Sequence, residues 1–206
     1  MPANQFLLKA QMKLILCDAD GCLLDWEWAF RAWMSERGYE FNRAGKISYA
    51  LHQHYYDLAP DDVGKLCRIF NETAAIGFLG PVRDSVHYVR RLYEEHGYRF
   101  RVITSVSLDP RVKQLREINL RQLYGNAIES VVCLDVNADK TPELIRYRDS
   151  GLYWIEDKTE NADVGHQLGL KSILIEHGHN MNHECPYPKV KNWSEIYQLI
   201  TSDQSA

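Results

Sequence analysis

Short apolar segments recur along the chain and alternate with longer segments in which apolar and polar residues are mixed. The first apolar segment, Lys13–Asp18, ends in an acidic residue and is typical of a strand that is buried on both faces. Four further segments have the same character: Phe100–Thr104, Ser130–Leu134, Leu152–Glu156 and Ser172–Ile175. The pattern therefore predicts five strands.

Amphipathic helices are expected between these strands. Over Val82–His96 the apolar residues share one stripe of a helix. Two more helices should begin where an N-cap residue precedes a proline, at Asp109-Pro110 and Thr141-Pro142, and a fourth should cover Asn161–Gly169. Strands that alternate with helices through short connections predict an α/β fold, a Rossmann-like parallel five-stranded sheet with helices on both faces.

One connection is much longer than the others. More than 60 residues separate the first strand from the helix at Val82, whereas a strand-to-helix loop typically has ~2–6. This stretch has its own helical patterns, over Glu27–Arg37, Gly45–Tyr56 and Asp61–Asn71. We therefore expect a core domain of residues 1–25 and 80–206. A small helical cap, residues 26–79, should lie above the carboxyl ends of the strands, where open α/β sheets bind ligands.

Composition narrows the class of partner. The 206-residue chain has 45% hydrophobic residues and a net charge of -4, so it lacks the basic balance that binding to nucleic acid or an anionic membrane requires. A small molecule is the partner we expect. No apolar run is long enough to cross a membrane and no secretory signal is visible. The five cysteines form no CxxC pair, so we expect reduced thiols in a cytoplasmic protein.

Two acidic residues stand where the first strand ends, in Asp18-Ala19-Asp20-Gly21. Carboxylates at positions i and i+2 of such a turn can face one cleft, and Gly21 permits a sharp exit and a close backbone approach. The pair could bind Mg²⁺, which takes one or two carboxylates together with phosphate oxygens and water. By itself the motif is equally compatible with an acidic turn that caps a strand.

Chemically useful residues also follow three of the other strands. Thr104-Ser105 offers hydroxyl groups to an anion, and Lys140 precedes an expected helix start, where an ammonium and helix amides could meet an anion together. Glu156-Asp157 supplies a second acidic cluster for a metal ion. Each feature alone is common in loops. Their order along successive strand ends favours one shared site.

This set resembles the four motifs of the haloacid dehalogenase superfamily, and the resemblance covers most of the chain. It implies that Asp18 attacks phosphorus, and that Asp20 acts first as general acid and then as general base. It also implies that Thr104, Ser105 and Lys140 bind the phosphoryl group. Mg²⁺ would be the cofactor, bound by three residues: Asp18, the Asp20 carbonyl and Asp157.

A closer similarity is to the 5′(3′)-deoxyribonucleotidases. The helical insertion follows a DxDGxLxD motif, a Phe-Leu-Gly-Pro-Val segment precedes the helix at Val82, and the second motif reads Ile-Thr-Ser. The resemblance implies a nucleoside monophosphate substrate whose base stacks on aromatic residues of the cap, for which Trp26, Trp33 and Phe78 are our hypotheses. The chain departs from that family at Glu156, which leaves open whether this residue contacts the metal.

Other interpretations remain. The same scaffold could hydrolyse another small phosphate, such as a sugar phosphate, and only the cap would distinguish the two. A non-catalytic binding domain would not need Asp18, Asp20, Lys140 and Asp157 together. A P-loop kinase is disfavoured because the chain has no glycine-rich phosphate loop. The oligomeric state is left open, a homodimer included.

One loop after the last predicted strand contains residues of the types that bind zinc: His177, His179, His183 and Cys185. Their spacing lacks the regularity of a structural zinc site. Solvated histidines that border the mouth of the active site are the interpretation we favour.

Overall fold

The sheet in the computed structural model, which describes residues 13–42, 48–55 and 57–203, is parallel and has the strand order β3-β2-β1-β4-β5-β6. The strands are β1 (Lys13–Cys17), β2 (Tyr98–Ser105), β3 (Ile128–Leu134), β4 (Tyr153–Glu156), β5 (Lys171–Ile175) and β6 (Lys189–Val190). The predicted α/β class is confirmed, but the predicted number of five strands is wrong. The sixth strand has only two residues and pairs with the end of β5, so it is too short to leave a periodic pattern.

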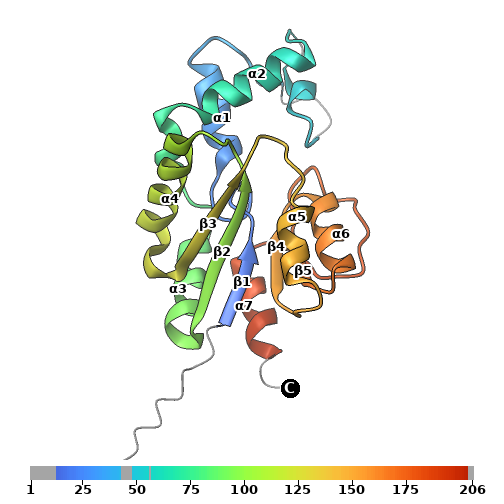
Figure 1. Ribbon diagram of the computed structural model, residues 1–206. Helices are drawn as coiled ribbons and strands as arrows, with labels where there is room; N and C mark the ends of the chain where they lie inside the picture. The colour runs from blue at the N-terminus through green and yellow to red at the C-terminus, as the bar shows by residue number, and fades with distance from the viewer. Residues whose placement is uncertain (1–12, 43–47, 56, 204–206) are drawn as a thin grey trace, which may run out of the picture.

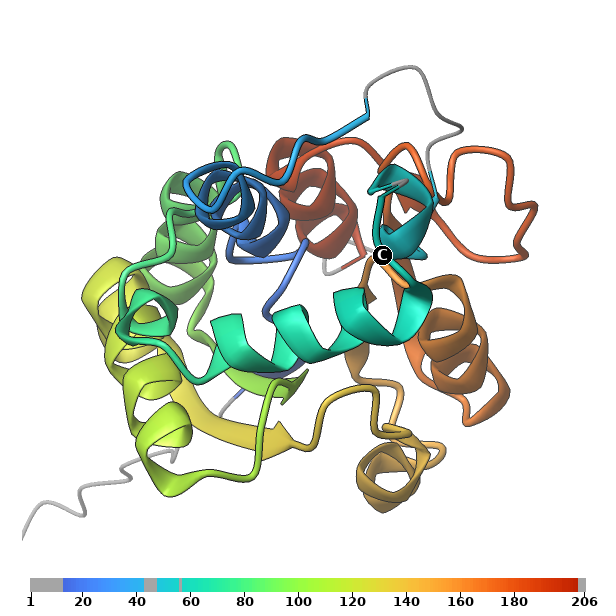
Figure 2. The same cartoon turned by 90° about the horizontal axis from the view of Figure 1, so that it is seen from above.

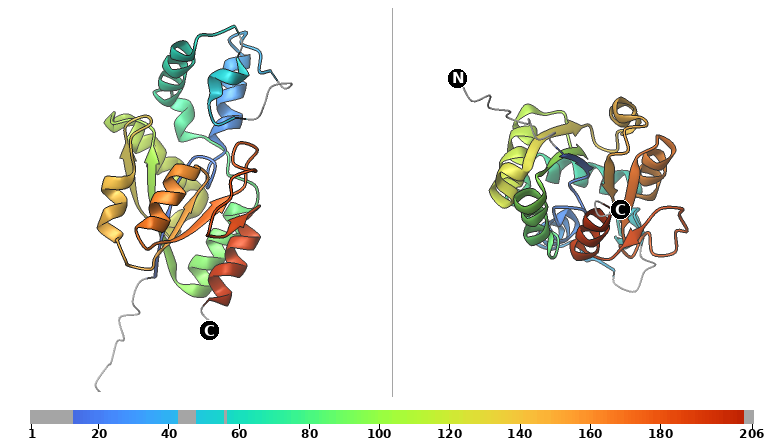
Figure 3. Two further views of the ribbon diagram at one scale, coloured as in Figure 1. Left: turned by 90° about the vertical axis from the view of Figure 1, so that its right-hand side faces the viewer. Right: turned by 90° about the horizontal axis from the view of Figure 1, so that it is seen from below.

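Helices cover both faces of the sheet (Figure 3). The core contains α3 (Ser85–His96), α4 (Pro110–Tyr124), α5 (Thr141–Leu144), α6 (Thr159–Gln167) and α7 (Trp193–Ser202), with short 3-10 turns η3 (Gly125–Ala127) and η4 (Ile145–Tyr147). In β1, Ile15 and Cys17 belong to the apolar core beneath α3, α4 and α7, whereas Leu16 belongs to the core on the opposite face, near α5 and α6. This alternation is the period of two expected of a strand that is buried on both faces.

Two helix predictions need correction. The helix expected from Val82 begins at Ser85, and Asp84 precedes it as the N-cap. The helix expected at Thr141 is a single turn of four residues that continues as the 3-10 turn η4, so it contributes few aligned amides. The start of α4 is as predicted, since Asp109 accepts a hydrogen bond from the backbone N–H of Arg111 and Pro110 follows.

The insertion lies above the carboxyl ends of the strands, with α2 crossing over the sheet in the view from above (Figures 1 and 2). It consists of α1 (Trp26–Ser35), η1 (Leu51–His54), α2 (Pro60–Asn71) and η2 (Ala74–Gly77). The helix predicted over Gly45–Tyr56 lies partly outside the described residues, and its described part has only the turn η1.

The two chain segments that join the insertion to the core run side by side. The backbone N–H of Asp25 donates to the carbonyl of Gly80 at 2.9 Å, and that of Val82 donates to Leu23 at 2.9 Å. These contacts support the division that we propose, with residues 26–79 as cap and residues 1–25 and 80–206 as core. Among the helices of the described residues, none has the length and apolar character that crossing a membrane requires.

Candidate active site

A cavity of about 550 Å³ lies between the carboxyl ends of the strands and the insertion. Its walls include the predicted residues from four strand ends: Asp18, Asp20, Thr104, Ser105, Lys140 and Asp157. The parallel sheet brings them together because every strand end reaches the same edge.

Lys140 links two carboxylates at the base of the cavity. Its ammonium lies 2.8 Å from Asp18 Oδ1 and 2.8 Å from Glu156 Oε1, and all three groups are buried. Removing charges from water is costly unless they are paired and hydrogen-bonded. The pairing therefore holds the Lys140 ammonium beside the Asp18 carboxylate.

Glu156 is saturated with hydrogen bonds. Oε1 accepts from Lys140 and from Asn161 Nδ2 at 2.6 Å, and Oε2 accepts from the backbone N–H groups of Asp157 at 2.8 Å and Lys158 at 3.1 Å. Burial acts to raise the pKa of Glu156, but the Lys140 charge and these hydrogen bonds lower it. Glu156 therefore holds its neighbours in place, and the four hydrogen bonds to its two oxygens argue against a role as a metal ligand.

The pKa values of the other two carboxylates, Asp18 and Asp157, are shifted in the opposite direction, upward. Burial raises the pKa of Asp18 to about 7, against the charge of Lys140 and together with the repulsion of Glu156 and Asp20. Burial, followed by the charges of Glu156 and Asp18, raises the pKa of Asp157 well above its usual range. Lys140 thus contacts two of three buried acids, and a bound cation would offset the excess negative charge.

Gly21 makes room for Asp157. Its φ is +75°, and a Cβ at this position would lie 2.4 Å from Asp157 Oδ2. A side chain at residue 21 would therefore both strain the backbone and displace the carboxylate. The contact packs Asp157 against the turn that carries Asp18 and Asp20. The oxygen atoms of these three residues could bind a hard cation such as Mg²⁺.

A different cluster brings three ligand-type side chains within 4.8 Å of one another in the described part of the chain: Cys22, Glu156 and Asp157. Glu156 is occupied, and burial raises the pKa of the Cys22 thiol well above its ordinary value. Because the thiolate is the metal-binding form, we favour the oxygen donors over this cluster.

The two hydroxyl groups after β2 differ. Thr104 is fully buried, and its Oγ1 has no hydrogen-bond partner among the described residues. Ser105 donates to the carbonyl of Ala138 at 3.2 Å. A buried polar atom without a partner is costly. Thr104 is therefore the hydroxyl available to an oxyanion in the cavity, whereas Ser105 holds the following loop.

Asp20 has a partner that the sequence reasoning missed. Arg116 of α4 is completely buried, and its two terminal nitrogens each contact one carboxylate oxygen of Asp20, with Nη2 to Oδ2 at 3.1 Å. A signal was present in the sequence, because Arg116 lies on the same helical face as the buried Val112 and Leu120. A charged residue on an apolar stripe needs a buried partner.

The loop after β5 that contains His177 and His179 makes hydrogen bonds to the segments that follow β1 and β4. His177 Nε2 lies 2.8 Å from the Gly21 carbonyl, and Asn180 Nδ2 donates to the Asp157 carbonyl at 2.7 Å. His179 borders the same cavity, and burial lowers its pKa. His183 and Cys185 are directed elsewhere: the first lies 3.5 Å from Asp163, and the second donates to the Tyr187 carbonyl. In the described residues the four do not form a zinc site.

The three cap aromatics that we considered for substrate contact lie in different environments. Trp26 lines the cavity, stacked 4.8 Å from Phe30, and its Nε1 donates to Asn71 at 2.8 Å. Trp33 does not line it, because its ring packs against Phe30 and Phe70 in the apolar core of the insertion. Phe78 is 75% exposed and lies outside the cavity. Of the three, the structure brings only Trp26 to the site.

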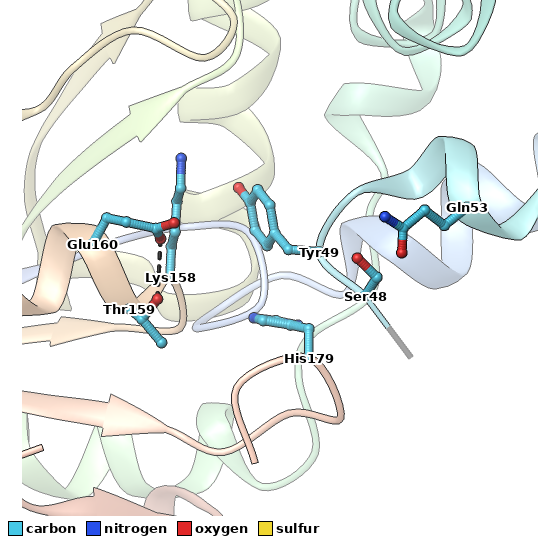
Figure 4. A pocket seen from close by; sticks show the side chains of 7 residues that line it. All are labelled: Ser48, Tyr49, Gln53, Lys158, Thr159, Glu160 and His179. Atoms are coloured by element: carbon cyan, nitrogen blue, oxygen red, sulfur yellow. Dashed lines mark hydrogen bonds between the residues drawn. The ribbon is translucent and has the colours of Figure 1, made fainter. Parts of the chain in front are cut away.

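Tyr49 is an aromatic residue of the cavity wall that we did not predict from the sequence. It is 51% exposed, it lines the main cavity, and it also lines a side pocket of about 330 Å³. Figure 4 shows its ring close to Lys158 and His179. The Lys158 ammonium lies 5.1 Å from the ring centre, and the His179 ring lies 5.2 Å away. Aromatic residues are frequent throughout the insertion, so spacing alone could not distinguish Tyr49.

Comparisons with known proteins identify the fold. No protein-family model and no curated protein matches the sequence. Among solved structures, a haloacid dehalogenase-like hydrolase from Streptococcus pneumoniae is 14% identical, with a TM-score of 0.63 over 92% of this chain and 98% of that one. CbbY from Rhodobacter sphaeroides, in complex with phosphate, is 16% identical, with a TM-score of 0.56 over 90% and 96%. L-2-haloacid dehalogenase from Xanthobacter autotrophicus, with chloropropionic acid covalently bound, is 10% identical, with a TM-score of 0.57 over 92% and 98%. The chain thus has the fold of haloacid dehalogenase-like hydrolases.

Proposed function

We propose that the protein is a Mg²⁺-dependent phosphomonoester hydrolase that forms an aspartyl-phosphate on Asp18 and prefers nucleoside monophosphates. One observation carries the proposal. Three residues line the same cavity: Asp18 with a buried carboxylate, its ion-pair partner Lys140, and Thr104, whose hydroxyl has no hydrogen-bond partner among the described residues. A phosphoryl group needs these three elements, because its transfer depends on positioning and on offsetting negative charge.

The metal would be held by the carboxylates of Asp18 and Asp157 and by the carbonyl oxygen of Asp20. When bound, Mg²⁺ supplies positive charge that offsets the repulsion between the nucleophile and the phosphoryl oxygens. The excess of buried acids and the contact between Gly21 and Asp157 both support this assignment.

In the first step, an oxygen of Asp18 forms a bond to phosphorus while the bond from phosphorus to the leaving oxygen breaks. Protonated Asp20 gives its proton to that oxygen, so an alcohol departs. Lys140 and Thr104 hold the oxygens of the phosphoryl group during the transfer. The products of this step are the alcohol, an acyl phosphate on Asp18 and the Asp20 carboxylate.

In the second step, a water oxygen attacks the phosphorus of the acyl phosphate, and the bond to Asp18 breaks. Asp20 accepts a proton from the water. Inorganic phosphate leaves, and both aspartates return to their starting states.

Solved structures with this fold include haloacid dehalogenases, so the two chemistries must be separated. A halide leaves without a proton, whereas an alkoxide needs one. Asp20 lies at the cavity, where it can supply that proton, and the second acid, Asp157, adds a metal ligand that phosphoryl transfer requires. These residues favour the phosphatase.

The substrate preference rests on the cap. Trp26 and Tyr49 are planar side chains that line the cavity beside Asp18. Stacking of a base on an aromatic side chain contributes about 1–3 kcal/mol. A sugar phosphate is the second candidate, favoured by the polar side pocket that includes Ser48, Gln53 and Lys158.

A substrate panel tests the proposal. Phosphate release should be measured from nucleoside monophosphates, sugar phosphates and glycerol phosphate, with Mg²⁺ and with a chelator. We expect activity only with the metal, and a kcat/KM for the best nucleotide about tenfold above that for any sugar phosphate. An equal kcat/KM for a sugar phosphate would contradict the nucleotide preference and leave a general phosphatase. Dehalogenation without phosphate release would overturn both proposals.

A further inference from the structure

Arg116 contacts the active site although it belongs to the outer layer of the fold. It lies in α4, 96 residues from Asp20 in sequence, and contacts the Asp20 carboxylate. Its guanidinium is fully buried, and the hydrogen bonds that it makes in the described structure go to the two oxygens of Asp20. Its remaining nitrogen, Nε, has no partner among the described residues.

This arrangement is a poor way to stabilise a fold. A buried charge must be paired, and even paired charges are often no more stabilising than apolar residues of similar size. The neighbours of Arg116 on its helical face, Val112 and Leu120, are buried and apolar, so an apolar side chain would suit the position. The guanidinium therefore points to a role at Asp20 itself.

The contact fixes the carboxylate of Asp20. A guanidinium presents two parallel N–H groups that define the plane of a carboxylate, which a lysine ammonium cannot do. Each carboxylate oxygen has two lone pairs, so one position on each remains outside the Arg116 contact, and it can carry the proton that is given to the leaving oxygen or accept the proton of the attacking water. The Asp20 side chain is 25% exposed, which leaves those lone pairs accessible from the cavity.

We propose that Arg116 is a positioning residue that holds the Asp20 carboxylate in the orientation needed for proton transfer. This inference rests on the proposed phosphatase function and deepens it. Arg116 does not touch the substrate; it acts through Asp20. Its loss should therefore reduce turnover while leaving substrate binding intact.

The decisive experiment is a double-mutant cycle that joins Arg116→Met with Asp20→Asn. Turnover should be measured on an alkyl phosphate, whose leaving group needs a proton, and on p-nitrophenyl phosphate, whose leaving group does not. Arg116→Met should lower kcat on the alkyl phosphate by about 10²-fold, the scale of a misplaced catalytic group, with KM nearly unchanged. The loss on p-nitrophenyl phosphate should be clearly smaller.

In the Asp20→Asn background, Arg116→Met should change kcat by no more than about twofold, because the group that it positions is already gone. Arg116→Lys should recover part of the activity through a single-point contact. Arg101→Met is the matched control, since it removes another partly buried ion pair, with Glu129, on β2 outside the cavity. It should leave the ratio of the two substrates unchanged.

Equal losses on both substrates, or the same loss with and without Asp20, would make Arg116 merely structural and overturn the inference. Crystal structures of the wild type and of Arg116→Lys provide a readout that does not depend on activity. We expect a single Asp20 rotamer in the wild type and several in the variant. An inactive wild type with an ordered Asp20 would refute the phosphatase and leave the anchoring in place. An ordered Asp20 in the variant would refute the anchoring.

Discussion

The strand ends of the core and the insertion above them contribute to the same cavity in different ways. At the strand ends, Asp18, Lys140 and Glu156 are buried and held by ion pairs and backbone hydrogen bonds. In the insertion, the residues that line the cavity include Tyr49, which is half exposed, and Trp26. Under the proposed function, the reacting groups therefore lie in the tightly held segments that follow the strands, whereas the surface that would select the substrate lies on less constrained segments.

The largest expected effect comes from a substitution at the strand ends of the core. Asp18→Asn should lower phosphate release by about 10⁴-fold or more, as loss of a covalent nucleophile does in other enzymes. An amide is a far weaker nucleophile and a poorer metal ligand. Asp139→Asn, an exposed acid outside the cavity, is the control and should stay active. Circular dichroism should show that both variants fold, and a tenth of wild-type activity in Asp18→Asn would remove it from the nucleophile role.

The second prediction concerns the contact between Gly21 and Asp157. Gly21→Ala should weaken Mg²⁺ binding and activity strongly, because its Cβ would lie 2.4 Å from Asp157 Oδ2. The matched control is Gly38→Ala, which has a similar φ of +81° and no atom of the described residues within 4 Å of the added Cβ. Both variants have the same backbone strain of about 1–2 kcal/mol. A difference in Mg²⁺ affinity between them, measured by calorimetric titration, therefore reports the displaced carboxylate and not the strain. Equal affinities in the two variants would argue against Asp157 as a ligand.

On the cap side, Tyr49→Ala should lower kcat/KM for nucleotides by roughly 5- to 150-fold, the equivalent of about 1–3 kcal/mol of stacking. Hydrolysis of p-nitrophenyl phosphate should change much less. Phe78→Ala, which removes an exposed ring outside the cavity, should leave both activities as they are. A parallel loss on both substrates would mean that Tyr49 supports the cap and does not select the base.

The last expected effect is on stability. Bound Mg²⁺ should raise the melting temperature, because it offsets the repulsion among Asp18, Glu156 and Asp157. At a concentration of 100 times its dissociation constant, a ligand of the native state adds about 2.7 kcal/mol. Differential scanning fluorimetry with and without the metal measures this, and Asp157→Asn should abolish most of the shift. An unchanged melting temperature in the wild type would contradict the metal site.

The sequence predicted the core better than the cap for a physical reason. A buried strand and the polar residue that ends it leave a local pattern, so Asp18 and Thr104 could be inferred one strand at a time, and Lys140 from the helix start that follows it. Partners that meet only through tertiary packing leave weaker signals. Arg116 reaches Asp20 from α4, and Glu156 is occupied by donors that come from three segments.

The cap residues also show that contacts made by tertiary packing are hard to predict from the sequence. Trp26 and Trp33 lie on one helix and carry the same side chain, yet only Trp26 faces the cavity. Which ring forms the wall depends on how α1 packs against α2, and the aromatic density of the segment does not encode that choice. The two-residue strand β6 was missed for the related reason that pairing, rather than periodicity, defines it.

The central claim is the covalent intermediate on Asp18, and trapping it is the most direct test. The wild-type protein should be mixed with Mg²⁺ and a nucleoside monophosphate, quenched in acid within the first turnover, digested and analysed by mass spectrometry. We predict a phosphorylated Asp18 that is absent from Asp18→Asn and accumulates in Asp20→Asn, whose second step lacks its base. Phosphate release with no modified Asp18, or with the phosphoryl group on another residue, would contradict the account.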